Sequence, residues 1–370
     1  MLNARFVRIY VVPGAVYQSV MVGGGYGTGR EIVEYFTSYG MLGGALGLLI
    51  AFATLAVVLS LTFEVSRVFG AYDYRNFFKV LLGRGWFVYE ILIVLFFLLV
   101  LAVVAAAAGN ILSDNFGISY YAGIGLMLIF IGVLTFYGRE LVAKALTFWS
   151  LYLYLMFISF FALVVLWQGD AIGSALAARE VHAGWAVSGF KYALYNLAAV
   201  PLLLYVARGF RTRSETLLSG LAAAAIALLP ALISHFSFLA AYPQIVSQAI
   251  PIYWLLTAMG ASVFMIFYSI MLFGTFVETG AGMLQGINDR LDAFLTEKRG
   301  RGLSRLSHAA IAMTAMLVSA ILSAGGIVRL IADGYGAMAW GFFAVYVVPL
   351  ITIGVFRLSR GEHNAARNPV

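Results

Sequence analysis

The segment from Ile91 to Gly109 contains no charged or polar side chain. A helix that crosses a bilayer needs about 20 mostly apolar residues, and its backbone groups must be satisfied within the helix because the hydrocarbon core holds no water. The whole chain shares this character, since 63% of its residues are hydrophobic and 11% are charged. Soluble domains are about half apolar and about a quarter charged. The sequence therefore predicts an all-α integral membrane protein.

Ten apolar segments of spanning length follow one another along the chain. They cover approximately 6–38, 41–68, 86–112, 118–136, 141–168, 187–209, 214–241, 254–286, 306–323 and 336–357. These segments leave no room for a soluble domain, so we expect a single transmembrane domain over 1–370. We predict a charged loop from Asp289 to Arg305. In the connection from Tyr242 to Tyr253, Pro251 is expected to end a short helix.

Basic residues are distributed unevenly between the two ends of the predicted spans. With the N-terminus placed in the cytoplasm, 19 of the 23 Lys and Arg residues fall in cytoplasmic segments. Arg179 and Arg329 fall outside, while Arg30 and Lys191 fall within spans one and six. Because such asymmetry orients membrane proteins, we expect a multi-pass protein of the inner (plasma) membrane with both termini cytoplasmic. The net charge of +7 then reflects orientation and contact with membrane lipid, not binding to nucleic acid.

Several kinds of chemistry are disfavoured by what the chain lacks. It contains no cysteine, and its four histidines are scattered without a metal-ligand pattern. No GxxxxGK[ST] motif occurs, so we expect no ATP hydrolysis by the chain and no sign of an ATPase subunit as partner. No histidine–carboxylate cluster or nucleophile–base pair is evident. We therefore expect a protein that is not an enzyme and carries no cofactor.

Glycine interrupts the first apolar segment. The run Gly23-Gly24-Gly25-Tyr26-Gly27-Thr28-Gly29 holds five glycines in seven residues. Glycine is poor in helix interiors, and an unwound backbone inside a membrane must line a cavity or bind a ligand. Thr28 is a reasonable N-cap for an outer half-helix, whose positive end would attract electron-rich groups. We assign these seven residues to a substrate site; a small-residue face for helix packing is the alternative.

The sixth segment carries a second, weaker interruption at Asn196 and Pro201. Proline removes one backbone donor, although kinks without function are common in membrane helices. Breaks in spans one and six indicate an inverted repeat of five plus five spans, with repeats of about 6–168 and 187–357. We add Tyr192, Tyr195 and Asn196 to the substrate site, because aromatic rings flanking the breaks suit an alkylammonium group.

Charged residues inside spans are expensive and therefore suggest function. Glu31 lies one turn into the outer half-helix, where it either couples transport to protons, binds a cation, or pairs with Lys191 of the sixth span. We assign both residues to ion coupling, and pairing is the favoured role of Lys191. Glu34 is expected to be a solvated vestibule charge, and Glu278 either pairs at an inner gate or faces an inner vestibule.

The stretch Gly23 to Phe36 (GGGYGTGREIVEYF) resembles the first-helix motif of YkvI-like membrane proteins, which belong to the amino acid–polyamine–organocation (APC) superfamily and have the LeuT fold. The stretch Lys191 to Leu197 (KYALYNL) is similar to the start of that family's sixth helix. Arg30 departs from the family, where a glutamine-like residue is expected. Arg30 either favours an anionic substrate group or pairs with Glu34, one turn on.

The resemblance implies a substrate site between helices one and six and a sodium site between helices one and eight. On this chain Gly23 would supply one wall of the sodium site. Tyr268 and Ser269 are assigned to the helix-eight side by counting along the helix, so the predicted Na⁺ ligands are Gly23 and Ser269.

The sequence therefore predicts a secondary active transporter. It would move a small amino-acid-like or amine-containing solute by alternating access, coupled to Na⁺ or H⁺. The alternative is a ligand-sensing membrane receptor or channel subunit that has the same fold and no net transport. A membrane-embedded enzyme is a third and weaker hypothesis.

Overall fold

The computed structural model describes residues 4–137, 139–300 and 302–360. These residues form helices and short connections, without a β-strand in that part of the chain. Two of the basic residues assigned to the cytoplasmic side, Arg301 and Arg367, lie outside the described residues. Within the described residues, eight segments are long and apolar enough to cross a membrane: Arg30–Phe69, Tyr74–Phe116, Tyr152–Ala178, Trp185–Gly209, Arg213–Ala241, Ser262–Asp292, Leu306–Ser323 and Ile327–Ser359. A shorter apolar helix covers Tyr120–Val133.

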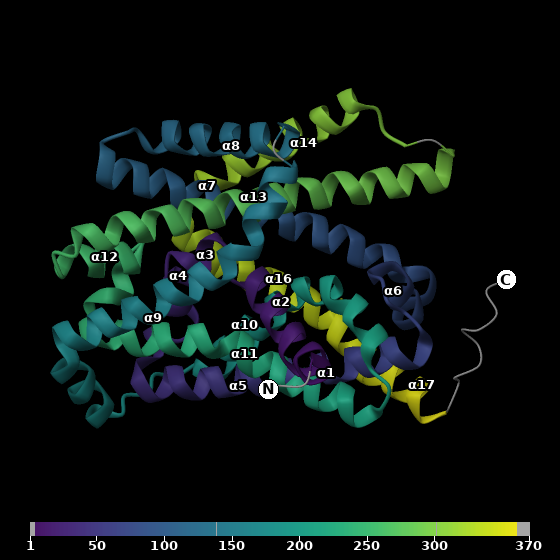
Figure 1. Ribbon diagram of the computed structural model, residues 1–370, viewed down its shortest axis with the longest axis horizontal. Coiled ribbons are helices and arrows are strands. Elements are labelled where there is room, and N and C mark those ends of the chain that lie inside the picture. Colours follow the sequence, from purple (N-terminus) through teal and green to yellow (C-terminus); the bar gives the residue numbers. More distant parts are fainter. Residues whose placement is uncertain (1–3, 138, 301, 361–370) are drawn as a thin grey trace.

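Two groups of helices form the molecule (Figure 1). We call the first group the bundle helices: α2 (Val12–Met21), α5 (Gly40–Phe69), α10 (Trp185–Asn196) and α11 (Arg213–Phe238). We call the second group the scaffold helices: α7 (Phe87–Phe116), α8 (Tyr120–Tyr137), α13 (Ser262–Arg299) and α14 (Arg305–Ser323). In the bundle α11 packs on both α5 and α2 and α10 packs on α5, and in the scaffold α7 packs on α8, α13 and α14.

Small residues allow the bundle helices to approach closely. A Cβ added to Gly189 of α10 would overlap the backbone of Gly47 on α5, and one added to Gly220 of α11 would overlap Ser60 on α5. Association of helices in lipid depends on such close packing because hydrophobic burial gives little advantage there. The bundle therefore behaves as one packed unit.

The first segment is not one continuous helix. It consists of α1 (Ala4–Phe6), the π-helical η1 (Val7–Val11), α2, α3 (Gly24–Gly27) and α4 (Arg30–Tyr35). The chain leaves the helical conformation at Val22 and at Gly23, which has φ −94° and ψ −166°. It leaves it again at Gly29, where φ is +84°, a value that glycine adopts without strain. A single helical turn of glycine and tyrosine therefore stands between two interruptions.

The sixth segment changes helix type without a gap. It continues directly from α10 into the 3₁₀ helix η4 (Leu197–Gly209), which contains Pro201. Runs of 3₁₀ helix longer than three or four residues are uncommon and often mark a hinge or a strained sequence.

Three predicted boundaries are wrong. Pro251 begins the short helix α12 (Pro251–Ala258) and does not end one, because proline fits the first helical turn, where its missing N–H is not needed. The predicted segment 254–286 is divided at Gly260, which has φ +64°. The predicted loop after Asp289 is helical as far as Arg299, since the sequence there contains good helix formers and ends at Gly300.

The remaining helices connect the two groups or flank them. They are η2 (Thr37–Tyr39), α6 (Tyr74–Leu82), η3 (Gly83–Trp86), α9 (Arg139–Ala178), η5 (Leu239–Ala241), η6 (Gln244–Ser247), α15 (Ile327–Arg329), η7 (Leu330–Tyr335), α16 (Gly336–Phe342), η8 (Phe343–Val347), η9 (Leu350–Gly354) and α17 (Val355–Ser359). Helix α9 is kinked at Gln168, whose φ of −142° is not helical. Helix α16 packs on both α10 and α7, so it contacts both groups.

Candidate functional site

A cavity of about 50 Å³ lies where the first segment is interrupted, between the bundle and the scaffold helices. It is lined by Val20, Met21, Gly23, Glu31, Phe96, Phe97, Val100, Tyr195, Asn196, Ala198, Ala199, Leu202, Thr279, Met283 and Tyr335. Among the described residues that line it, Glu31 is the one that carries a charge. The first, third, sixth and eighth predicted segments contribute to the lining, together with the connection that precedes the tenth.

The carboxylate of Glu31 is held by the sixth segment. The hydroxyl of Tyr195 donates a hydrogen bond of 2.6 Å to Oε2 of Glu31, and the backbone N–H of Tyr26 also bonds this side chain. Glu31 is buried, with 3% of its surface exposed. A Cβ at Gly25 would overlap Oε1 of Glu31, so any larger residue here would force the carboxylate to move. The glycine interruption and the buried charge are therefore one structural unit.

Three aromatic rings stand beside this carboxylate. The ring centroids of Tyr195 and Tyr335 are 4.8 Å apart, and those of Phe96 and Tyr335 are 5.5 Å apart. Phe96 also lies 6.3 Å from Tyr195. Ring faces attract cations, and the attraction grows when water is excluded. A negative side chain beside aromatic rings in a largely apolar cavity suits a positively charged group.

Other side chains occupy the backbone carbonyls that the interruptions expose. The hydroxyl of Thr28 donates to the carbonyl of Gly25 at 2.7 Å, and the hydroxyl of Tyr268 donates to the carbonyl of Gly27 at 2.8 Å. The hydroxyl of Tyr17 donates to the carbonyl of Asn196 at 3.2 Å. Because unpaired carbonyls are costly in the membrane interior, these bonds stabilise the non-helical backbone.

The structure corrects the helix-eight side of the predicted sodium site. Ser269 does not approach Gly23: it accepts a hydrogen bond from Tyr253 at 2.5 Å and donates one to the carbonyl of Met265 at 2.6 Å. The residue beside Gly23 is Thr279, whose Oγ1 would lie 3.7 Å from a Cβ on that glycine. Ten residues of helix correspond to about 15 Å, so counting along the helix placed the site too far toward its start.

The predicted pair between Glu31 and Lys191 is also wrong. Glu31 is bonded by Tyr195, one turn further along α10, and the ion pairs among the described residues do not include Lys191. The ammonium group of Lys191 lies near Gly336 of α16. A neutral hydroxyl thus takes the place that the sequence assigned to a cation.

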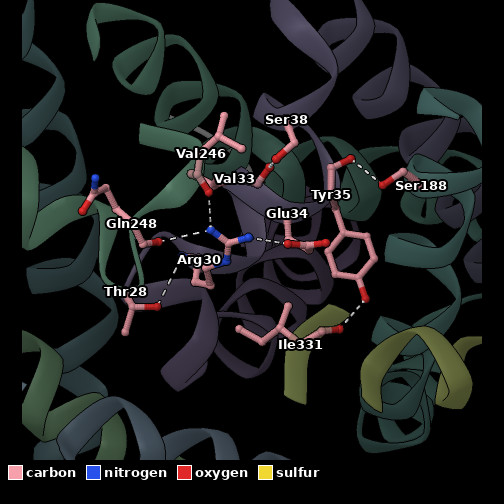
Figure 2. Close-up of polar contacts among 10 residues, drawn as sticks. All are labelled: Thr28, Arg30, Val33, Glu34, Tyr35, Ser38, Ser188, Val246, Gln248 and Ile331. Carbon is pink, nitrogen blue, oxygen red and sulfur yellow. Dashed lines mark hydrogen bonds and ion pairs between the residues drawn. The ribbon is translucent and has the colours of Figure 1, made fainter. Parts of the chain in front are cut away.

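One side of the cavity is closed by a polar network around Arg30, which we call the Arg30 side (Figure 2). The Arg30 guanidinium donates to the carbonyl of Val246 at 2.7 Å and to that of Gln248 at 3.1 Å, and it also pairs with Glu34. Arg30 was predicted either to favour an anionic substrate group or to pair with Glu34, and the structure shows the ion pair with Glu34. Glu34 is accordingly an ion-pair partner, with 26% of its side chain exposed.

Tyr35 extends this closure to two further segments. Its hydroxyl donates to the carbonyl of Ile331 at 2.9 Å, and its own carbonyl accepts a bond of 2.8 Å from Ser188 of α10 (Figure 2). The opposite side of the cavity, which we call the Leu202 side, is lined by the apolar residues Val20, Leu202 and Met283. Leu202 is 48% exposed.

The structure separates the predicted substrate residues into two sets. Gly23, Tyr195 and Asn196 line the cavity. Tyr26 and Tyr192 are buried beside it in ring contacts, Tyr26 with Phe157 and Tyr192 with Phe36. The other glycines permit close packing: added Cβ atoms would lie 2.6 Å from Val104 at Gly24 and 2.7 Å from Leu272 at Gly27. The functional and packing interpretations therefore apply to different glycines of one run.

Phe96, Thr279 and Tyr335 line the cavity and were missed from the sequence. Phe96 lies within a continuous apolar run and Tyr335 within a glycine-rich connection, so neither stands out among the 50 Phe and Tyr residues of the chain. Thr279 carries a local signal, because it follows the intramembrane Glu278. Among the described residues, no group of three or more His, Asp or Glu side chains could hold a metal ion.

Comparison of the sequence with known proteins finds one similar membrane protein. No family model matches the chain. The uncharacterized membrane protein YkvI of Bacillus subtilis (strain 168) is 27% identical over 320 residues, which cover 83% of this chain and 86% of YkvI. The chain thus resembles YkvI over most of its length. The resemblance drawn from Gly23 to Phe36 is thereby confirmed.

Two solved structures have the fold of this YkvI-like chain. A Na⁺-coupled sialic acid symporter, solved in a substrate-bound outward-open state, matches with a TM-score of 0.61 and 13% identity over 92% of this chain and 78% of the symporter. A manganese transporter mutant of Eremococcus coleocola matches with a TM-score of 0.53 and 12% identity over 98% and 82% of the two chains. At these identities the likeness shows the LeuT fold alone. The count of ten spans stays a prediction.

Proposed function

We propose that this chain is a secondary active transporter for a small amine-containing solute. The observation that carries the proposal is the buried carboxylate of Glu31, fixed by Tyr195 at the interruption of the first segment and lining a cavity. Paired interruptions at matching positions of two halves mark the substrate site in transporters of this architecture. Both solved proteins with this fold are described as transporters, which supports the class but not the solute.

The chemistry of the cavity favours a cationic group on the solute. Glu31 supplies a negative charge, and Phe96, Tyr195 and Tyr335 supply ring faces around it. An ammonium group placed here gains a charge-assisted hydrogen bond and cation–π contact. An amine or an amino acid bound through its ammonium group satisfies these requirements.

The size of the cavity supports alternating access. The cavity of about 50 Å³ is small beside the roughly 300–1,000 Å³ typical of small-molecule sites, which supports movement of the surrounding helices when a solute binds. The Arg30 side is closed by directional hydrogen bonds, whereas the Leu202 side is lined by apolar side chains, of which Leu202 is about half exposed. We infer that the bundle helices rock against the scaffold helices to open one side at a time.

The full proposal includes an inverted repeat of five plus five spans with breaks in the first and sixth, in one transmembrane domain. The protein would lie in the inner (plasma) membrane with both termini cytoplasmic, which makes the Arg30 side the outer one. The asymmetry of Lys and Arg residues supports this orientation.

Two places can couple transport to an ion gradient. Thr279 and the backbone at Gly23 offer hydroxyl and carbonyl oxygens, the ligand type that Na⁺ prefers, at the interruption nearest the Leu202 side. Glu31 offers instead a carboxylate that exchanges a proton as the cavity opens and closes. The two alternatives predict different ion dependence.

The test is a thermal-shift screen of the purified protein in detergent. Amino acids, amines, betaines and nucleobases are added in sodium or in potassium, each at two pH values, because ligand binding to the folded state raises the melting temperature. We expect amines to give the shift and uncharged isosteres to give none. Dependence on sodium would assign coupling to Gly23 and Thr279, and dependence on pH would assign it to Glu31.

Reconstitution distinguishes a transporter from a sensor or channel subunit. Proteoliposomes loaded with the identified amine should exchange it for labelled amine outside, which is counterflow. Binding without counterflow would instead support the ligand-sensing alternative. A shift with anionic solutes only would contradict the amine proposal.

A further inference from the structure

A second pocket opens on the surface, on the same side of the molecule as the Arg30 network. It is bounded by the end of α9, the start of α5, the loop between α9 and α10, and η5 with the two residues that follow it. One of these two, Pro243, leads directly into η6 and the Val246 carbonyl that bonds Arg30. The described residues that line the pocket differ from those that line the central cavity. We call it the α9 pocket.

The α9 pocket is large enough for a small molecule. Its volume of about 770 Å³ falls within the range of roughly 300–1,000 Å³ that is typical of small-molecule sites. One wall consists of the short side chains that α9 presents along its last turns: Ala171, Ser174, Ala175 and Ala178. Residues three and four apart share a face of a helix, and side chains this short leave space above it. Met41 and Leu239 add apolar surface from two other elements.

The loop that forms the rim is fixed by its backbone. The carbonyl of Glu180 accepts hydrogen bonds from the N–H groups of Leu42 at 2.9 Å and Gly43 at 3.1 Å. The N–H of His182 donates to the carbonyl of Tyr39 at 3.0 Å. These bonds hold the loop against the start of α5. The side chains of Glu180 and His182, which both line the pocket, therefore extend from a positioned backbone.

Three polar side chains meet at this rim. Nε2 of His182 lies 2.8 Å from the hydroxyl of Tyr242 and 3.7 Å from Oε2 of Glu180. The hydroxyl of Tyr242 also bonds the carboxylate of Glu180. Partial burial, together with this hydrogen bond, raises the pKa of Tyr242, so the phenol stays neutral. Glu180 is thus the negative member of the cluster.

The charge of Glu180 is open to a ligand. Within the described part of the chain, His182 is the basic residue within ion-pair distance of this carboxylate. Histidine changes its charge between about pH 5 and 8, so at about pH 8 it does not neutralise a carboxylate. Arg179 is adjacent in the chain but does not line the pocket. The side chain of Glu180 is 49% exposed, which leaves it within reach of an incoming cation.

We propose that the α9 pocket binds a small organic cation, with an alkylammonium ion as the simplest case. The ammonium group would bond the carboxylate of Glu180 and face the ring of Tyr242, while the alkyl chain would contact Met41 and the alanines of α9. The bound cation would lie beside the η6 segment that closes the Arg30 side. This site does not involve Glu31, so it is independent of the proposed solute site.

Methionine-methyl NMR can follow the two sites separately. Met41 lines the α9 pocket, whereas Met21 and Met283 line the central cavity. Protein labelled with ¹³C-methyl methionine is titrated in detergent at about pH 8 with butylammonium chloride or with butanol, and Met41→Leu assigns the Met41 resonance. We expect a saturating Met41 shift with butylammonium only, with a dissociation constant on the order of millimolar, because exposed charge pairs and cation–π contacts are weak. No Met41 shift, or an equal shift with butanol, would overturn the proposal.

Charge variants assign the response to Glu180. Glu180→Gln should weaken the Met41 response about fivefold, the upper limit for an exposed charge pair, and leave those of Met21 and Met283 unchanged. The matched control is Asp333→Asn, which removes a carboxylate whose side chain is 78% exposed in another connection. Equal loss in both variants would show diffuse charge attraction and contradict the proposal. A Met41 response without any response of Met21 and Met283 would support this pocket and count against the solute site.

A last arm distinguishes a free cation from a lipid headgroup, because phosphatidylethanolamine also carries an ammonium group. The same titration is made in nanodiscs of dioleoylphosphatidylglycerol, with and without dioleoylphosphatidylethanolamine. We expect butylammonium to shift the Met41 resonance with the same affinity in both. Loss of the shift only when phosphatidylethanolamine is present would show that the headgroup occupies the pocket, and the assignment to a free cation would be wrong.

Discussion

The interruptions of the first and the sixth segments differ in kind. The first leaves the helical conformation at Gly23 and again at Gly29, and side chains from other helices bond the backbone between them. The sixth passes from α10 into 3₁₀ helix at Leu197 without a gap. The comparison teaches that glycine creates the site at the first interruption, while Pro201 changes only the winding of the second. Variants of the first should therefore have larger effects.

The largest effect is expected from Glu31→Gln. This change keeps the size of the side chain and removes the charge that faces the cavity, so amine affinity should fall at least about a hundredfold, the loss typical of one partner of a buried charge pair. Titration of the thermal shift with the identified amine measures it. Glu34→Gln is the matched control and should bind normally, because Glu34 bonds Arg30 outside the cavity. Unchanged affinity in the Glu31 variant would remove this carboxylate from the site.

Gly25→Ala should follow, with affinity reduced roughly tenfold. Its Cβ would overlap Oε1 of Glu31, and a crowded site of this kind typically loses about 1–3 kcal/mol. Isothermal titration or thermal shift with the amine gives the affinity. Gly282→Ala adds the same methyl group to α13 where no atom lies within 4 Å, so it should behave as the wild type. Equal behaviour of the two variants would show that Gly25 does not position the carboxylate.

Arg30→Gln should open the Arg30 side while leaving the site intact. It loses charged hydrogen bonds to Val246 and Gln248, so the closed population should fall and access from that side should rise on the order of tenfold. The chain has no cysteine, which allows a single Asn196→Cys to be labelled with a membrane-impermeant maleimide. Labelling of Asn196→Cys should be slow while Arg30 is present and faster when Arg30→Gln is added to the same background. Equal rates would show that the network does not close the cavity.

Pro201→Ala should have the smallest effect. Alanine restores a backbone donor in η4 and should draw this segment toward regular helix, with amine affinity changed by no more than about threefold. The same titration that measures Gly25→Ala checks this. A larger loss than that of Gly25→Ala would reverse the comparison and make the sixth segment the principal site.

Much of the fold could be predicted because its determinants are local. Apolar length predicts an all-helical membrane protein, although the count of ten spans stays a prediction, and the run from Gly23 to Gly29 marks where the first segment leaves the helical conformation. Boundaries failed where a helix leaves the membrane or turns at one glycine, as at Arg299 and Gly260. An apolar pattern marks only the part of a helix that lies in the membrane. Residues with high helix propensity can extend the same helix beyond the membrane surface.

The candidate site was predictable on the first and sixth segments and not on the others. Each of three lining residues has a signal in the sequence. Gly23 belongs to a glycine run, Glu31 is a charge inside a predicted span, and Tyr195 is an aromatic residue beside a predicted break. Thr279, not the predicted Ser269, lies beside Gly23. The relative position of two helices along their axes decides which residues meet, and the sequence of one helix does not contain that information. For the same reason, Glu31 is bonded by Tyr195 and not by Lys191, which lies one turn earlier on α10.

The sequence by itself determined that this is a helical membrane protein, where its chain is interrupted and which charge lies inside. These properties follow from composition and from the conformational freedom of glycine, which act within a few residues. Only the tertiary structure decided that Tyr195 bonds Glu31, that Phe96 and Tyr335 complete the ring cluster, and that Arg30 closes one side of the cavity. The physical reason lies in helix geometry, because each residue turns the helix by about 100° and advances it by about 1.5 Å. A small rotation or shift of one helix against another therefore changes which side chains meet, and packing between segments far apart in sequence sets that position.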